Sequence, residues 1–396
     1  MVRISVEPMS ERVNAFERSL QRLLSHVKWD EQGVLSAFQD MMIAVTSDPM
    51  GIFLIDDTSF PKKGQESVCV ARQYCGASGK TDNCQVGVSM TYIGQGAAWP
   101  FGMKLFVPES WDNGDTECLQ RRNKTKMPDS IHYRPKWRIA LELLDEAASK
   151  QVPHWAVLTD GWYGDIPEFR QELVKRGERH ILGIYSDTQV FLESPTVEYG
   201  PPPERQRGRP RKKAQVLAAS PGPIKVSAVG AAIIDDAWQR LAIRQDSRNK
   251  PLVVEAVSLR VYPVHGWRNG VVHEDVWLLI ERRHLAKGGV ELRYFFSNMP
   301  QTMATLGLAR LNHQRYWIEH GYQQLKEELD LDHHEGRSWL GWHRHVLLTF
   351  LAYGYLTLIR LEQKKQRHLS MWNQWRLHRG ILGKELISDI NCRYDD

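Results

Sequence analysis

The stretch GIFLIDDTSF, residues 51–60, decides how we expect this chain to fold. The apolar run before its first acid, residues 52–55, is short, which is typical of a buried strand. Asp56 and Asp57 follow directly. A second stretch, HWAVLTD at residues 154–160, repeats the pattern with a short apolar strand that leads into Asp160. Two predicted strands therefore each end in an acidic residue.

Each of these acids also has a purely structural interpretation. Asp56 could end its strand at a turn, and its neighbour Asp57 leaves open which of the two is functional. Asp160 precedes Gly161, and a strand followed by Asp-Gly is often only a turn. Their joint placement favours a site, because side chains at strand ends reach the open edge of the sheet, where α/β folds bind ligands.

The segments around these acids predict an α/β fold, because strands alternate with helices. Strand composition and helical spacing give the order β, β, β, α, β, α, β. The strands after the first are expected at residues 67–74, 84–92, 155–158 and 180–185, and the helices at residues 136–148 and 166–175.

Changes in composition divide the chain into five parts. After residue 187 the chain first becomes basic and proline-rich, and then dense in β-branched residues. Residues 301–329 are expected to form one long helix. The parts are a helical N-terminal region (1–48), the first part of an α/β core (49–186), a β-rich insertion (187–287), the second part of the core (288–363) and a C-terminal tail (364–396).

A third acid stands in LNHQRYWIEHGYQQLK, residues 311–326. Arg315, Glu319 and Lys326 are spaced i, i+4 and i+11. At about 100° per residue these offsets return to within about 40° of one direction, so the three side chains share a helix face. The alternative is a solvated face with an ordinary ion pair.

Three carboxylates that converge on one site repel one another, and divalent cations are the usual way to neutralise them. Asp56, Asp160 and Glu319 are the candidates. Two metal ions about 3.5–4 Å apart can bind the attacking and the leaving oxygen of a phosphodiester. The three acids therefore predict metal-assisted cleavage of a nucleic-acid strand.

Composition limits the other classes of function. The chain has 396 residues and a formal net charge of +5, and its five cysteines include no CxxC pair. A disulfide framework or zinc site is therefore not expected, and a reducing compartment fits. Residues 345–359 are too short to span a bilayer, and residues 1–10 lack the apolar core of a signal peptide. We expect a cytoplasmic protein.

Basic residues gather in RQRGRPRKK, residues 205–213. This segment resembles an AT-hook, and its proline favours an extended backbone. Arg207, Arg209 and Arg211 are expected to contact DNA in an A·T-rich minor groove, where the negative potential is enhanced. The alternative is a solvated linker. Lys62 and Lys63, beside the first acid, are expected to contact phosphate.

Four stretches in combination resemble the DDE-type transposases of bacterial insertion sequences. The resemblance extends over about residues 20 to 360. It is carried by LIDDTSFPKKG (54–64), ARQYCGASGKTDNCQVGVSM (71–90), VLTDGWYGD (157–165) and RYWIEHGYQQLKEELDLDHHEGRSWLGWHRH (315–345).

This resemblance implies an RNase H-like mixed sheet flanked by helices, with the β insertion between the second and third acids. It further implies two Mg²⁺ ions, for which Mn²⁺ could substitute, and transposition by DNA cleavage and strand transfer. The partners it implies are double-stranded DNA, as element ends and as target, and a second copy of the chain. The implied location is the bacterial nucleoid.

Position by position, Asp56 corresponds to the first acid of the family, followed by Thr58 in the family's Asp-any-Thr pattern. Asp160 and Glu319 correspond to the second and third. Arg315 and Lys326 match the arginine and lysine of the Tyr-Arg-Glu-Lys signature and are expected to contact DNA.

The tyrosine of that signature falls at Asn312, where this chain departs from the pattern. Tyr316 and Tyr322 are the alternatives for stacking on a base. The departure motivates a second hypothesis, an inactive transposase-derived DNA-binding regulator. A third hypothesis is an endonuclease without strand transfer, which the sequence does not separate from a transposase.

Overall fold

The computed structural model describes residues 22, 27–198, 214–216, 220–245, 251–265, 272–285 and 288–390, and only the backbone of residues 198, 215, 245 and 367–390. The strands are β1 (Ile52–Pro61), β2 (Ala71–Cys75), β3 (Lys80–Gly94), β4 (Ala97–Leu105), β5 (Ala156–Thr159), β6 (His180–Ile184), β7 (Gln189–Phe191), β8 (Val197–Glu198), β9 (Gln215–Val216), β10 (Ile224–Lys225), β11 (Gln239–Gln245), β12 (Pro251–Pro263), β13 (Val276–His284) and β14 (Val290–Ser297).

Helices occupy the segments between these strands and both ends of the described chain. The α-helices are α3 (Glu31–Thr46), α4 (Thr116–Thr125), α5 (Lys136–Ser149), α6 (Gly161–Gly164), α7 (Pro167–Lys175), α8 (Val226–Ala231), α9 (Thr305–Asn312), α10 (Tyr316–Glu327) and α11 (Trp339–Ile390). The 3₁₀ turns are η1 (Glu109–Trp111), η2 (Asp235–Ala237), η4 (His313–Arg315) and η5 (Leu331–His333).

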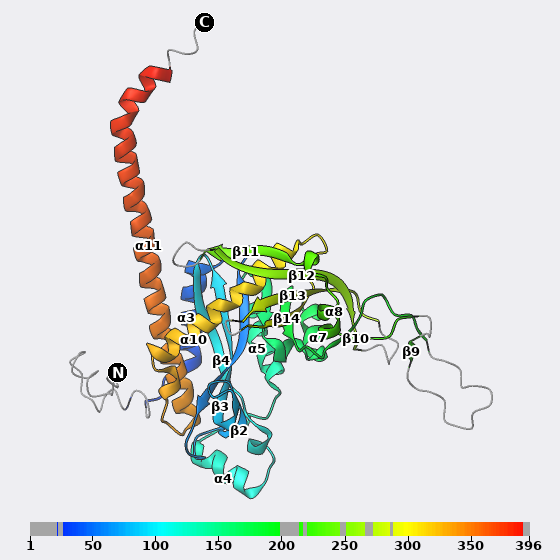
Figure 1. Ribbon diagram of the computed structural model, residues 1–396. Coiled ribbons are helices and arrows are strands. Elements are labelled where there is room, and N and C mark those ends of the chain that lie inside the picture. Colours follow the sequence, from blue (N-terminus) through cyan, green and yellow to red (C-terminus); the bar gives the residue numbers. More distant parts are fainter. Residues whose placement is uncertain are drawn as a thin grey trace.

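One large mixed sheet of 12 strands organises the molecule. β1 pairs antiparallel with β3 and parallel with β5, and β5 pairs parallel with β6. Beyond β6 the sheet continues through β14, β13 and β12, each pairing antiparallel with the one before. Helices flank this sheet (Figure 1). The predicted α/β class, a large mixed sheet flanked by helices, is therefore confirmed.

The early part of the sheet holds one strand more than we expected. β4 was not predicted, because Pro100 and Gly102 interrupt its apolar pattern. It pairs with β3 alone, and the register shifts between Met90 and Thr91, opposite this interruption. Proline is tolerated at such a position because an edge strand needs hydrogen-bond donors on one side only.

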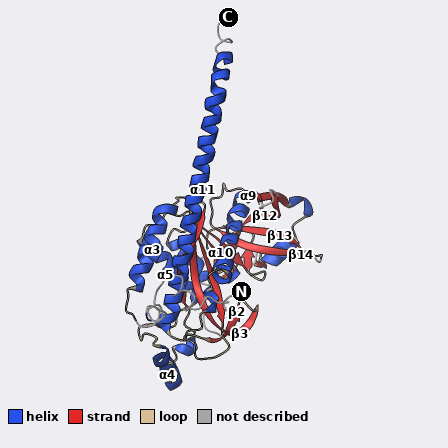
Figure 2. Cartoon of the chain, turned by 90° about the vertical axis from the view of Figure 1, so that its left-hand side faces the viewer, coloured by secondary structure: helices blue, strands red, loops and turns tan. Residues whose placement is uncertain are grey.

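Side chains of β1 alternate between two packed faces, as strand geometry requires. Phe53 and Ile55 belong to a core that also contains buried residues of α3, α5 and α11. Ile52 and Leu54 belong to a second core with residues of α9 and α10. Figure 2 shows α3, α5 and α11 grouped along one side of the strands. The two faces of β1 therefore have different helical neighbours.

The expected long helix over residues 301–329 is interrupted. η4 separates α9 from α10. At this break the buried Glu281 of β13 accepts hydrogen bonds from Asn312 Nδ2 at 3.0 Å and His313 Nε2 at 3.2 Å. These two hydrogen bonds connect the junction between α9 and α10 to β13 of the sheet, close to the start of α10.

The last helix is much longer than the predicted one, which ended near residue 363. α11 has 52 residues, and beyond its packed first turns it leaves the body of the molecule as a single rod (Figure 1). Within the described part of the chain, no helix combines the length and the apolarity needed to cross a membrane.

Candidate active site

Two acidic residues from separate parts of the chain meet at the end of β5. The parallel register pairs Leu54 with Leu158 and Ile55 with Thr159, where β5 ends. Asp56 and Asp160 follow Ile55 and Thr159 directly, so the register brings the two acids side by side. Asp56 does not end its own strand, as the sequence suggested, because β1 continues to Pro61 against β3.

The neighbouring acid Asp57 points to the opposite face of the sheet. Its carboxylate forms an ion pair with Lys136 of α5 at 2.7 Å and accepts a hydrogen bond from the Tyr163 hydroxyl at 2.5 Å. Asp56 alternates with it and shares the face of Leu54, which packs with α9 and α10. The geometry therefore favours Asp56 over Asp57 as partner of Asp160.

Burial and mutual repulsion make the Asp56–Asp160 pair electrostatically costly. Burial, and next the charge of Asp160, raise the pKa of Asp56 to about 7. Burial also raises the pKa of Asp160. The positive charge of Arg315 opposes both shifts. A carboxyl pair that holds a proton near neutral pH is a frequent property of functional sites.

Each of the two carboxylates has one oxygen fixed by the backbone. The amide of Asp57 donates to Asp56 Oδ1 at 2.8 Å, and the amides of Trp162 and Tyr163 donate to Asp160 Oδ1 at 3.1 and 3.4 Å. Among the described residues, Oδ2 of neither carboxylate receives a hydrogen bond. Two oriented carboxylates with free oxygens fit Mg²⁺, which commonly takes one or two carboxylates and completes its shell with phosphate oxygens and water.

The third predicted acid, Glu319, is exposed on α10. Nowhere in the described ranges do three or more histidine, cysteine, aspartate or glutamate side chains form a group that could hold a metal ion. Asp56 and Asp160 are thus brought together without Glu319. The other two residues of the predicted helix face interact electrostatically with Asp56. The charge of Arg315 opposes the rise in the pKa of Asp56, and the charge of Asp56 opposes the fall that burial causes in the pKa of Lys326.

Tyr322, on the same face of α10, contacts the strand that carries Asp56. Its hydroxyl donates to the Asp56 backbone carbonyl at 3.3 Å and forms a second hydrogen bond with the Ser89 hydroxyl. Because its hydroxyl is occupied inside the fold, Tyr322 is poorly placed to stack on a base. Tyr316, the other alternative, is 40% exposed, and the Arg244 guanidinium lies 3.9 Å from its ring centroid.

The lysines predicted to contact phosphate differ in their surroundings. The Lys62 ammonium is half-buried and donates to the His334 carbonyl, and burial lowers its pKa. Lys63 is exposed. Lys326 is half-buried, and burial lowers its pKa as well. The three arginines of the basic segment lie outside the described residues; they are Arg207, Arg209 and Arg211.

Sequence reasoning missed the hydrogen-bond partners of Asp57 and Asn312. Lys136 and Tyr163 bind Asp57 from positions 79 and 106 residues away. No local pattern links such distant positions, although Tyr163 lies within the quoted stretch VLTDGWYGD. Asn312, where the signature tyrosine was expected, is buried against Glu281 and so cannot face DNA as it stands.

With this geometry described, comparisons with known proteins can be added. A family model described as DDE superfamily endonuclease matches residues 1–250. A probable transposase for insertion sequence element IS701 from Microchaete diplosiphon is 29% identical over 177 residues. That match covers 44% of this chain and 43% of the relative, so the chain spans less than half of the relative's length.

Among solved structures, a piggyBac transposase synaptic complex with hairpin DNA resembles this chain weakly. The TM-score is 0.37 at 8% sequence identity, over 89% of this chain and 62% of that one. A likeness at this level is too low to support an assignment of fold or function.

Proposed function

The chain belongs to the family described as DDE superfamily endonucleases, whose model matches residues 1–250, and from this premise we propose that it is an insertion-sequence transposase. In this proposal it cuts double-stranded DNA at the ends of the element and transfers the freed ends to target DNA. Asp56, Asp160 and Glu319 are the proposed catalytic acids, and the sheet around β1 is proposed to be an RNase H-like core.

The observation that carries the proposal is the side-by-side placement of Asp56 and Asp160. Burial raises the pKa of both carboxyls, the charge of Asp160 raises that of Asp56 further, and the Oδ2 atom of each accepts no hydrogen bond from the described residues. Such a pair is costly in a fold unless a cation or a proton neutralises it. Bound Mg²⁺ would supply the positive charge that activates an attacking oxygen and stabilises a leaving oxygen of the phosphodiester. Mn²⁺ is a proposed substitute.

The roles of the protein groups follow from their surroundings. Asp56 and Asp160 would hold the cations through their free oxygens. Arg315, whose charge already acts on both carboxylates, would bind a phosphate of the strand being cut through its planar fork. Lys326 would add a point charge on the same helix face. Glu319 would approach the pair when DNA and cations occupy the site.

Further parts of the proposal concern partners and location. Lys62 and Lys63 are proposed to contact the phosphate backbone, and Arg207, Arg209 and Arg211 a minor groove. A homodimer on DNA, in the bacterial cytoplasm and at the nucleoid, is the proposed working state.

Cleavage of a labelled duplex that carries the ends of the element, in Mg²⁺, tests the three acids separately. We expect wild type to cut, and Asp56→Asn and Asp160→Asn to bind but to cut about 10²- to 10³-fold more slowly, because several kcal/mol of charge stabilisation are lost. Asp82→Asn is a matched control. Like Asp56, Asp82 accepts a hydrogen bond on Oδ1 from the backbone amide of the following residue, Asn83, at 2.8 Å, but it lies away from Asp56 and Asp160. It should cut normally.

Glu319→Gln tests the third acid, with Glu327→Gln as control on another face of the same helix. If Glu319→Gln cuts as fast as wild type while the two aspartate variants do not, the assignment of Glu319 is wrong. If wild type binds without cutting, the regulator hypothesis replaces the transposase. Cutting without joining to target DNA would indicate an endonuclease.

A further inference from the structure

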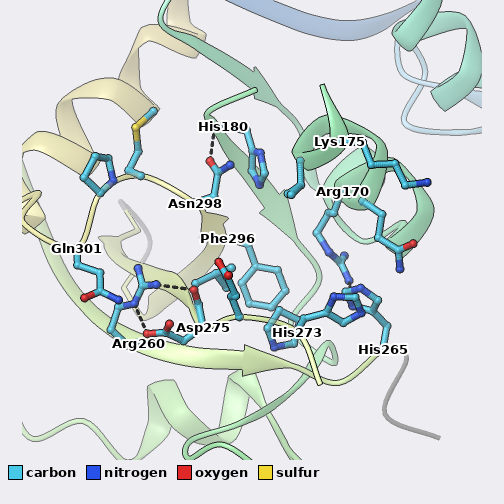
Figure 3. Close-up of a pocket in the computed structure, with 17 residues that line it drawn as sticks. Arg170, Lys175, His180, Arg260, His265, His273, Asp275, Phe296, Asn298 and Gln301 are labelled. Carbon is cyan, nitrogen blue, oxygen red and sulfur yellow. Dashed lines mark hydrogen bonds and ion pairs between the residues drawn. The ribbon is translucent and has the colours of Figure 1, made fainter. Parts of the chain in front are cut away.

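A cavity of about 600 Å³ lies on the other part of the sheet, away from the candidate acids. Its walls come from α7, from β6 and β14, and from the chain around the ends of β12 and β13 (Figure 3). None of the proposed catalytic or DNA-binding residues that the structure describes lines it. Its volume is in the range of pockets that hold small organic molecules.

Arg170 of α7 forms a positively charged end of this cavity. Only 8% of the residue is exposed, and its guanidinium lies 5.4 Å from the ring centroid of Phe296. It donates to the Gly164 carbonyl and, at 3.2 Å, to His265 Nδ1, while its Nε finds no acceptor in the described part of the chain. Across the described residues Arg170 forms no ion pair with a carboxylate. The carboxylates of Asp165 and Glu168 act on its charge from a distance, and burial still lowers the pKa of Arg170 to about 10. A buried cation without a direct ion pair is expensive, and an anionic ligand would neutralise it.

Two histidines adjoin Arg170 at this end. The rings of His265 and His273 stack with centroids 4.0 Å apart (Figure 3). Burial and the charge of Arg170 lower the pKa of His265 to about 3, and the same causes lower the pKa of His273. Because Nδ1 of neutral His265 accepts from Arg170, its proton must lie on Nε2. Nε2 of each histidine is buried and has no hydrogen-bond partner among the described residues.

Arg260 supplies a further donor on another wall. Its Nε donates to Asp275 Oδ2 at 2.7 Å and its Nη2 donates to the Asp275 backbone carbonyl. Within the described ranges its Nη1 has no hydrogen-bond partner. The remaining lining mixes apolar and polar side chains. The apolar ones include Pro263, Val276, Phe296, Met299 and Pro300, and the polar ones include Lys175, Glu274 and Asn298. The cavity thus combines hydrogen-bond donors that lack acceptors with apolar side chains. Of its two acids, the partly exposed Asp275 is paired with Arg260, and Glu274 is exposed.

We propose that this cavity binds the phosphate group of a small phosphorylated molecule, with Arg170, His265 and His273 as the anion-binding residues. A phosphate offers several acceptor oxygens, which matches several donors that lack acceptors. The apolar walls would contact the organic part of the ligand. A phosphate of the DNA backbone has the same chemistry, and the experiment separates the two sources. The ligand site is independent of the proposed cleavage of DNA.

Isothermal titration calorimetry of the full chain with inorganic phosphate, with deoxyadenosine monophosphate and with a short random duplex tests this inference. We expect saturable binding of the two small ligands. Arg170→Gln should weaken it by about 10- to 100-fold, the usual effect of losing a charged hydrogen bond. His273→Phe keeps the stacked ring and removes the donor, and it should weaken binding by about 10-fold.

His284→Phe is the matched control, because His284 is 64% exposed near the far end of β13 and makes an ion pair with Glu255. It should bind like wild type. If Arg170→Gln fails to fold, as judged by circular dichroism, His273→Phe still decides. Binding of the duplex alone, weakened by His273→Phe, would support the phosphate site and identify DNA as its source. Absence of saturable binding by all three ligands up to about 10 mM, or equal binding by His273→Phe, would overturn the inference.

Discussion

Replacing Asp56 by asparagine should stabilise the fold at alkaline pH in metal-free buffer, although it removes a proposed catalytic acid. Burial and the charge of Asp160 raise the pKa of Asp56 from 3.8 to about 7. Between these values the folded state keeps a proton that the unfolded state has released. The stabilising effect of that proton is complete below about pH 4 and is lost as the pH rises through about 7.

The size of the effect follows from the shift of about three pKa units. At about 1.4 kcal/mol per unit, the ionised carboxylate costs the folded state about 4 kcal/mol. Asp160 shares the repulsion, and part of the proton belongs to the pair rather than to Asp56. We therefore expect Asp56→Asn to raise the free energy of unfolding by about 2–4 kcal/mol at about pH 8, and to change it little at about pH 4.

Urea unfolding with a chelator present, at about pH 4 and about pH 8, measures this difference. Asp57→Asn is the control with the opposite sign. Asp57 is paired with Lys136 at 2.7 Å and with the Tyr163 hydroxyl, so its loss should cost about 1–3 kcal/mol. The reasoning is refuted if Asp56→Asn destabilises the protein at about pH 8, or if its effect is the same at both pH values.

Three other predictions concern the same region. Mg²⁺ should raise the thermal midpoint of wild type at about pH 8 by binding the folded state, and Asp160→Asn should abolish that rise; an equal rise in the variant contradicts the metal site. Asn312→Ala should lower the free energy of unfolding by about 1–3 kcal/mol in urea, because it removes the donor 3.0 Å from buried Glu281; an unchanged value would show that the contact is unimportant. In Gly183→Ala the new Cβ would lie 2.8 Å from the Gly161 nitrogen and 3.0 Å from the Asp160 carbonyl carbon. The displaced Asp160 should slow DNA cleavage about 10-fold or more, and a normal rate in the cleavage assay would mean that the site tolerates the shift.

The family prediction made from four stretches of sequence is confirmed by the match over residues 1–250. The α/β class and the existence of a strand before Asp56 and before Asp160 were also predicted correctly, because short apolar runs are local features. The end of β1 was not, because pairing with β3 extends it to Pro61. β4 was not predicted, because a proline and a glycine interrupt the apolar pattern of this edge strand. The roles of Asp56, Asp160 and Glu319 stay predictions.

Sequence by itself determined the α/β class, the apolar runs before Asp56 and Asp160, and the types of side chain available, because hydrophobic spacing and residue identity act within one turn or strand. Only the tertiary structure decided which of two adjacent aspartates faces Asp160. That choice depends on the register of β1 against β5, and on Lys136 and Tyr163, which lie far away in the chain. The cavity around Arg170 is a product of tertiary packing too, since its walls come from segments separated by more than a hundred residues.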